Sequence, residues 1–353
     1  MRNSLRLFII IQVSFFIFSV CGISIAEDLP IKNIHGIRYY APNAEKLQSP
    51  APLFKLSYGP GKEQVGGINQ DPEHLTDGLP TALRARKDGS IWILDSNNKA
   101  LKLFSPKGKL IESTDLTSIL IEPGLFVKDF APAPSGGFYL LSPLDGMIKH
   151  IGPDGKLIQS IEGFFDALEI NNSKSGSVLV RAPAMGALFK FSPEAVIEKQ
   201  FKDPELYPFE DVQGRPYGLN GSDEKVLLYR CDTDDAKQKK VLQVFALGKV
   251  LEGVSPGQGF LHGVRFVGYR IIGTDAAGRI YVELVTANQD GIVFSHTINR
   301  ILPKGTLDKI IQISPIPFLA PDLARHFSVT PDGRILGFYE EKGDYFLCSY
   351  TFP

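Results

Sequence analysis

The sequence predicts an all-β fold, a six-bladed β-propeller that is closed by an N-terminal strand in its last blade. Six stretches of the chain share one order of features: a glycine turn, a run of apolar or β-branched residues, a polar connection and a second such run. Successive copies are spaced by roughly 40–55 residues, the period of propeller blades. The sixth copy is one strand short, and a spare strand stands near the other end of the chain. Because such small sheets expose their edges and faces, radial packing is the arrangement that buries them.

The first copy, KDGSIWILD at residues 87–95, shows the pattern most fully. Asp88-Gly89 predicts a tight turn, and Ile91–Leu94 is a run of strand formers. The surrounding sequence supplies an inner strand at 80–86, a second at 90–95, a third at 100–105 and an outer strand at 109–116. One copy therefore has room for a four-stranded antiparallel blade.

The other five copies repeat this order with weaker turns or longer insertions. Their turn-and-strand stretches lie at 134–142, 173–181, 221–230, 275–284 and 330–340. No long apolar segment with a period of 3.6 residues interrupts them, so we expect little α-helix.

The two ends of the predicted propeller complement each other. The last copy stops after its third strand, YFLCSYTF at 345–352, while PLFKLSYG at 52–59 belongs to no copy. Pairing these segments would close the ring without a covalent bond. We therefore expect one propeller over residues 52–353, with residues 27–51 as a leader packed on its outside.

The N-terminus has the pattern of a secretory signal. Arg2 and Arg6 precede an apolar stretch at 7–20, and small residues stand at Ser24 and Ala26. We expect residues 1–26 to be a signal peptide that is cleaved after Ala26. This predicts a secreted or periplasmic protein with no membrane span after cleavage.

Two alternatives for the N-terminus stay open. Cys21 could carry a lipid, although the preceding Phe18-Ser19-Val20 is a poor match to the small-residue pattern before a lipoprotein cysteine. An uncleaved anchor is disfavoured because the apolar run is short for a bilayer span of about 20 residues. Beyond this segment only Cys231 and Cys348 remain, and they fall in non-adjacent blades, which favours two buried thiols over a disulfide.

The charge of the chain argues against nucleic-acid partners. Lys and Arg number 38 against 39 Asp and Glu, a formal net charge of −1. No basic stripe offsets this balance locally, so the sequence provides no field that would attract a polyanion.

Two motifs of the first copy resemble those of NHL-repeat and related six-bladed propellers. They are GSIWILD (89–95) followed by LKLFSPKGKL (101–110), and LSYGPGKEQVGG (56–67) leading to DGLPTALRARKDG (77–89). The resemblance covers about residues 50–353 and implies the propeller architecture. It implies no single activity, because the wider group includes binding scaffolds, lyases and lactonase-like hydrolases.

Candidate site residues follow from this architecture. Propellers usually bind ligands at the mouth of the central channel, on the face that carries the loops from second to third strands. Residues near the expected starts of the inner strands are Asp129, Asp166, Glu169, Tyr217, Arg265, Arg325 and His326. Asp129 and Asp166 could together hold Ca²⁺, which prefers carboxylate oxygens. Polar side chains in a wet channel need no ligand, however, and we expect no other cofactor.

The metal-dependent relatives in this group are matched poorly. Gluconolactonase-like propellers hold their metal with Glu and Asn or Asp at several inner-strand starts, where this chain offers a different mixture: Thr81, Asp129, Asp166, Tyr217 and Arg265. The six histidines are dispersed, without the close pair typical of a zinc site.

Two functions remain open at this point. The favoured one is an exported scaffold that binds a protein, peptide or glycan through the face with the two longest predicted loops, 230–240 and 285–296. The alternative is a metal-assisted, lactonase-like hydrolase or lyase that uses Ca²⁺ or Zn²⁺ and channel-mouth carboxylates. The sequence assembles no catalytic constellation, so it leaves the question of enzyme activity undecided.

Overall fold

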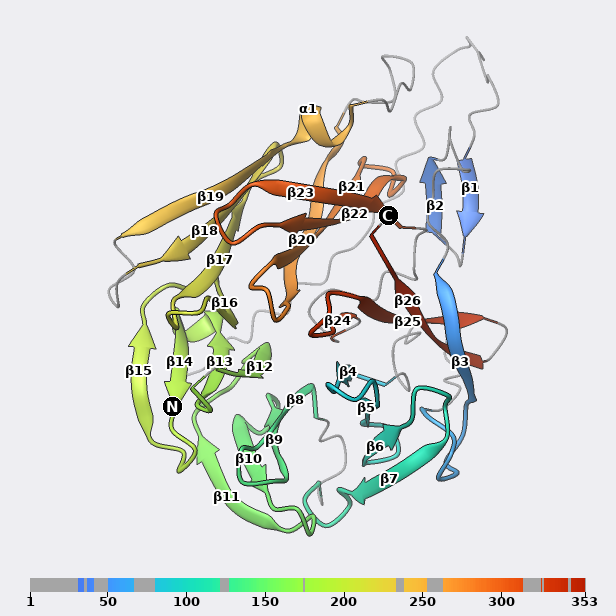
Figure 1. Cartoon of the computed structure of the whole chain (residues 1–353), viewed down its shortest axis with the longest axis vertical. Helices are drawn as coiled ribbons and strands as arrows, with labels where there is room; N and C mark the ends of the chain where they lie inside the picture. Colours follow the sequence, from blue (N-terminus) through green and yellow to red (C-terminus); the bar gives the residue numbers. More distant parts are fainter. Residues whose placement is uncertain are drawn as a thin grey trace, which may run out of the picture.

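The computed structural model is a six-bladed β-propeller, with six sheets arranged around a central axis (Figure 1). The structure describes residues 31–34, 37–40, 50–66, 80–120, 127–173, 175–232, 238–252, 263–313, 325, 327–341 and 344–352. The predicted fold class is confirmed, and the number of blades with it.

Blade one has the strand order that the sequence predicts. It consists of β4 (Ala82–Ala85), β5 (Ile91–Asp95), β6 (Ala100–Phe104) and β7 (Leu110–Asp115). Gly89 makes the first turn with a φ of 82°, a conformation that glycine adopts without strain. All residues of β5 and β6 are buried, whereas β7 is largely exposed as the outer strand.

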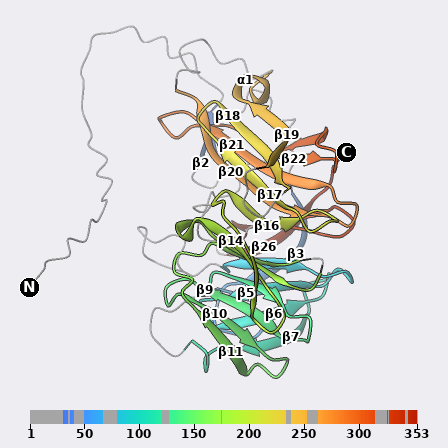
Figure 2. The ribbon, with the colours of Figure 1, turned by 90° about the vertical axis from the view of Figure 1, so that its left-hand side faces the viewer.

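The remaining blades follow in chain order around the ring. Blade two contains β8 (Asp129–Pro132), β9 (Phe138–Ser142), β10 (Met147–Ile151) and β11 (Leu157–Glu162). Blade three contains β12 (Glu169–Asn172), β13 (Val178–Ala182), β14 (Ala187–Phe191) and β15 (Ile197–Phe201), with a short 3-10 turn at Pro183–Met185. Blade four contains β16 (Leu206–Glu210), β17 (Pro216–Gly221), β18 (Lys225–Cys231) and β19 (Lys239–Ala246). The short helix α1 (Leu247–Val250) follows β19 at the edge of this blade (Figure 2).

Blades five and six complete the ring. Blade five contains β20 (Arg265–Thr274), β21 (Ile280–Ala287), β22 (Val293–Ile301) and β23 (Leu307–Gln312). Blade six contains β24 (Phe327–Val329), β25 (Ile335–Glu341) and β26 (Asp344–Tyr350). Its fourth strand is β3 (Ala51–Ser57), which pairs antiparallel with β26 from Asp344↔Ser57 to Ser349↔Ala51. The predicted closure by an N-terminal strand is therefore confirmed.

The strands of blade four are assigned one position too early by the sequence-based prediction. Residues 221–230 were expected to contain the second strand, but β18 is the third, and β17 is the second. The true first turn contains Gly214, with a φ of 75°, in the less typical sequence DVQGR. As a consequence, the end of β18 at Cys231 and the start of β19 at Lys239, which join the third strand to the outer strand, lie on the face opposite the predicted one.

The second long loop that the sequence predicts, residues 285–296, is mostly strand in the structure. Most of residues 285–296 extend β21 and β22, and only 288–292 connect them. The extension is possible because an N-terminal hairpin, β1 (Ile31–Ile34) and β2 (Ile37–Tyr40), completes the sheet. β2 pairs in parallel with β22 at Tyr39↔Val293, beyond the part of β22 that β23 covers. Tyr39 is fully buried there, and its hydroxyl accepts a hydrogen bond of 2.9 Å from Gln312 Nε2.

The core lies between neighbouring blades. Trp92 of blade one, for example, packs edge-on against Phe138 of blade two at 4.8 Å between ring centroids. Cys231 and Cys348 are buried in blades four and six, in agreement with the expectation of two buried thiols.

A buried ion pair fixes the segment that follows the closing strand. Lys102 Nζ lies 2.9 Å from Asp95 Oδ2 and donates to the carbonyl oxygens of Gly61 and Gln64. Asp95 Oδ1 accepts from the backbone N–H of Gly66 at 3.0 Å. The motif that resembles NHL propellers, LSYGPGKEQVGG, is thus anchored to blade one as far as residue 66.

Some sequence-based predictions fall outside the part of the chain that the structure describes. The predicted signal segment, 1–26, is one of them, and so is His326. Within the described ranges, no helix is long and apolar enough to cross a membrane.

Candidate ligand-binding site at the channel mouth

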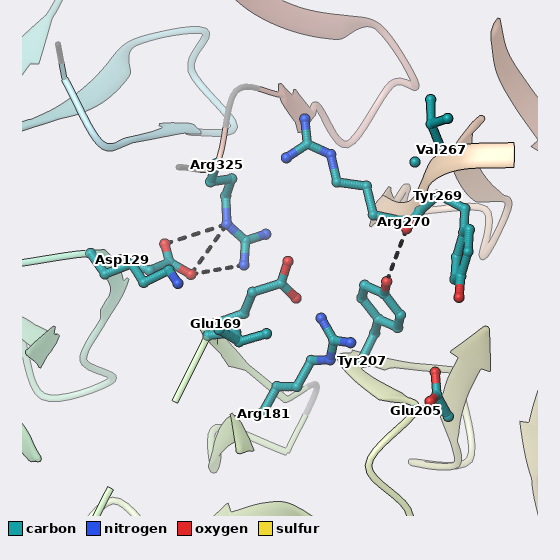
Figure 3. Close-up of a pocket in the computed structure, with 12 residues that line it drawn as sticks. Asp129, Glu169, Arg181, Glu205, Tyr207, Val267, Tyr269, Arg270 and Arg325 are labelled. Atoms are coloured by element: carbon teal, nitrogen blue, oxygen red, sulfur yellow. Dashed lines mark hydrogen bonds and ion pairs between the residues drawn. The ribbon is translucent and has the colours of Figure 1, made fainter. Parts of the chain in front are cut away.

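A pocket of about 230 Å³ opens at one end of the central channel (Figure 3). Its lining comes from blades two to six, mainly from the first residues of the inner strands. The charged lining residues are Lys128, Asp129, Glu169, Arg181, Glu205, Arg270 and Arg325. Tyr207, Tyr269 and Val267 add aromatic and apolar surface. The pocket lies on the face that carries the second-to-third connections, the face where the sequence places the site.

The starts of the inner strands converge here because each inner strand begins at this face and then runs along the channel toward the opposite face. Asp129 begins β8, Glu169 begins β12, and Arg325 precedes β24 and pairs with Ala82 of β4. Arg181 comes from the end of a second strand and stands opposite Glu169 in the register of β12 and β13. The side chains therefore meet although they are far apart in the sequence.

Asp129 is the most deeply buried charge in the pocket wall, with 2% of its surface exposed. Its carboxylate lies 2.9 Å from Arg325 Nη2 and 3.1 Å from Arg84 Nη2, and it accepts from the backbone N–H of Ile170 at 3.0 Å. We call Asp129, Arg84 and Arg325 the Asp129 cluster. It links blades one, two, three and six.

Electrostatics hold the Asp129 cluster in its charged form. Burial would raise the pKa of Asp129, but the charges of Arg325 and Arg84 and their hydrogen bonds outweigh it and lower that pKa. Burial and the neighbouring Arg325 lower the pKa of Arg84 to about 10, which leaves the guanidinium protonated at neutral pH. The cluster thus carries two positive charges and one negative charge.

Glu169 points toward the middle of the pocket, with Arg325 on one side and Arg181 on the other (Figure 3). Its Oε2 atom is buried and has no hydrogen-bond partner among the described residues. The guanidinium of Arg181 lies over the ring of Tyr207 at 4.1 Å, and the Tyr207 hydroxyl donates to the backbone oxygen of Tyr269 at 3.3 Å. Burial raises the pKa of Tyr207, so its hydroxyl stays protonated.

Arg270 forms the opposite wall and is held from behind. Its Nε donates to Glu283, and the other carboxylate oxygen of Glu283 lies 2.7 Å from His296 Nε2. Burial would raise the pKa of Glu283, but the charge of Arg270 and the contact with His296 lower it to about 2. The guanidinium of Arg270 is therefore fixed by a carboxylate that is ionised at neutral pH.

The structure brings three of the predicted site residues together and places three others elsewhere, while His326 lies outside the described residues. Asp129, Glu169 and Arg325 line the pocket. Asp166 lies in an exposed turn with a φ of 58° and does not line it. Tyr217 is buried in β17, as the shift in blade four requires, and Arg265 is exposed with Nη1 3.8 Å from Asp223 Oδ2. Among the residues that the structure describes, no group of three or more His, Cys, Asp or Glu could hold a metal ion.

The comparisons with known proteins assign no family to this chain. The sequence matches no protein-family model and no curated protein sequence. Solved structures with a similar fold include hydrazine synthase of Kuenenia stuttgartiensis (11% identity, TM-score 0.47, 74% of this chain and 76% of that one). They also include virginiamycin B lyase of Staphylococcus aureus (10%, 0.44, 76% and 94%) and a member of the DUF4221 family from Bacteroides vulgatus (9%, 0.46, 85% and 97%). At such identities no function can be transferred from them.

Sequence reasoning missed the residues that complete the pocket. Arg181 is the last residue of the predicted stretch 173–181. Tyr207 was missed because the strands of blade four were assigned incorrectly. Arg84 and Arg270 occupy interior positions of inner strands, where arginine is unusual unless it is paired. A charged residue in the middle of an inner strand is the signal that could have found them.

Proposed function

We propose that this chain is an exported binding propeller that recognises a protein, peptide or glycan at the channel mouth without catalysing a reaction. The observation that carries the proposal is the pocket itself: five blades contribute charged side chains, and ion pairs hold Asp129, Arg325 and Arg270 in place. Pre-organised polar groups favour binding because little conformational freedom is lost when a ligand arrives.

Two buried carboxylates, Asp129 in the pocket wall and Glu283 behind it, have the properties of ion-pair partners rather than of general bases. A general base works best when its pKa lies near the working pH. The pKa values of Asp129 and Glu283 are lowered by arginine partners, so both are weak bases. Their role is to orient Arg325, Arg84 and Arg270.

Support for export comes from the N-terminal sequence. The charged start, the apolar stretch at 7–20 and the small residues at Ser24 and Ala26 form a signal pattern. The N-terminal sequence of the protein recovered from its source cells tests this part, with residue 27 expected as the first residue.

The binding proposal is tested by blocking the pocket. Val267 lines it and is 41% exposed, so Val267→Trp fills the mouth without disturbing the core. Val244→Trp on the outer strand β19, where Val244 is 47% exposed, is the matched control. On glycan and peptide arrays, signals of the wild-type chain should persist in the control and be lost in Val267→Trp. Equal signals from all three proteins would refute a binding site at this mouth.

A further inference from the structure

We infer that the group which enters the mouth pocket is an uncharged sugar ring of a glycan, with its hydroxyls bridging Glu169 and the arginines. This inference rests on the proposed binding function and specifies its ligand. Three properties of the pocket support it: its size, its charge balance and the arrangement of its donors and acceptors.

The size of the pocket suits one ring. At about 230 Å³ it is smaller than the roughly 300–1,000 Å³ of pockets that hold drug-sized ligands. A single sugar unit fits such a volume, while the rest of a chain would lie across the face outside. Val267, which is 41% exposed, and Tyr269 offer the apolar surface that the C–H faces of a sugar require.

The charge balance disfavours a charged ligand. Four basic side chains and three acidic ones line one small space, so its net charge is only +1: Lys128, Arg181, Arg270 and Arg325 against Asp129, Glu169 and Glu205. Arg84 and Glu283 stand directly behind this lining and add one charge of each sign. An anion would therefore meet carboxylates and a cation would meet guanidinium groups, and like charges at contact oppose binding. A neutral ligand meets neither penalty.

The donors and acceptors match hydroxyl groups. The buried Glu169 Oε2 has no donor within the described residues, and a buried acceptor left in this state is costly. Glu169 and Arg181 are direct neighbours across β12 and β13, so a carboxylate and a guanidinium lie side by side. A hydroxyl donates one hydrogen bond and accepts others, so one sugar hydroxyl can donate to Glu169 while it accepts from an arginine. A peptide ammonium or carboxylate could satisfy only one of the two.

The test uses ligand-observed NMR on the purified full chain. The probes are neutral hexoses and their neutral polysaccharides, the corresponding amino sugars and uronic acids, and a set of short peptides with free termini. We expect a neutral sugar to bind, with a dissociation constant that changes less than about twofold when salt is raised, because no net charge is neutralised. Glu169→Gln should weaken binding by about tenfold or more, because the amide offers the hydroxyl a poorer acceptor and its own N–H groups face the arginines. The control Glu112→Gln, on the exposed outer strand β7, should leave binding unchanged.

The outcomes separate this inference from the proposed function. Binding of peptides or of charged sugars only, sensitive to Val267→Trp, would overturn the neutral sugar and keep the binding function. Binding of neutral sugars with equal affinity in Glu169→Gln would also overturn it, since Glu169 is the residue that selects hydroxyls. No binding of any probe would overturn both. Circular dichroism of each variant excludes misfolding as the cause, and Glu169→Ala provides a second variant at the same position.

Discussion

Asp129 and Arg325 form an ion pair of 2.9 Å that joins blade two to blade six at the mouth of the channel. Arg84 of blade one binds the same carboxylate, and the backbone of Ile170 extends the contact to blade three. The pair therefore serves two purposes. It connects two blades that are not adjacent, and it contributes to the charge of the pocket wall.

Removing the charge of Asp129 should destabilise the ring. Asp129→Asn leaves two buried guanidinium groups around a neutral amide, and loss of one partner of a buried ion pair costs about 3–5 kcal/mol. Urea denaturation measures the change in the free energy of unfolding. The control Asp332→Asn affects an exposed pair with Arg334 and should cost less than about 1 kcal/mol. Equal effects of the two substitutions would contradict the role of Asp129.

Acid should lower the free energy of unfolding because it protonates Glu283 in blade five. The folded pKa of this carboxyl is about 2, below its unfolded value of 4.5, so its contribution is complete above about pH 4.5 and disappears as the pH falls toward 2. At 1.36 kcal/mol per pH unit the contribution is on the order of 3 kcal/mol. Urea midpoints measured from about pH 6 to about pH 3 should fall more steeply in the wild type than in Glu283→Gln. Parallel pH profiles would contradict this prediction.

Shortening a side chain of the closing strand should open the ring. Leu56 of β3 is 5% exposed and packs in a cluster with Leu347, so Leu56→Ala should cost about 2–5 kcal/mol. Its neighbour Lys55 is exposed and pairs with Asp344 at 2.6 Å, and Lys55→Ala should cost at most about 1 kcal/mol. Thermal unfolding of the two variants distinguishes them. A small effect of Leu56→Ala would mean that closure does not depend on β3.

Breaking the Lys102–Asp95 pair should release the segment at 59–66. In Lys102→Met the buried Asp95 loses its counter-charge, and the carbonyl oxygens of Gly61 and Gln64 lose their donor. We expect a loss of about 3–5 kcal/mol and faster proteolysis within 59–66. Lys107→Met, in the exposed turn after β6, is the control. Unchanged cleavage at 59–66 would show that other contacts hold this segment.

Calcium should leave the melting temperature unchanged. Asp129 is surrounded by two arginines that repel a cation, and Asp166 does not line the same pocket. Thermal unfolding with added Ca²⁺ and with a chelator should agree within about 2 °C, since only a ligand of the folded state raises stability. A larger increase with Ca²⁺ would restore the lactonase-like alternative.

Local sequence patterns predicted most of the fold and three of the residues that line the candidate pocket. Turns such as Asp88-Gly89, followed by β-branched runs, identify strands because the glycine conformation and the burial pattern are local properties. Asp129, Glu169 and Arg325 could be selected because each stands at the start of an inner strand. Arg181 could not, because it lies at the end of a second strand and its approach to the pocket depends on how the blades are arranged around the axis.

The sequence by itself determined the repeat, the number of blades and the closing partner, since these follow from spacing and from strands that lack a partner. The tertiary structure decided the positions of the strands in blade four. The turn at Gly214 precedes the second strand, but its local sequence is also compatible with a different assignment of the strands. The tertiary structure also decided that residues 285–296 largely form strands, since the partner that makes this favourable, the hairpin ending at Tyr40, is more than 240 residues away. Contacts over such distances are set by packing, which no local pattern encodes.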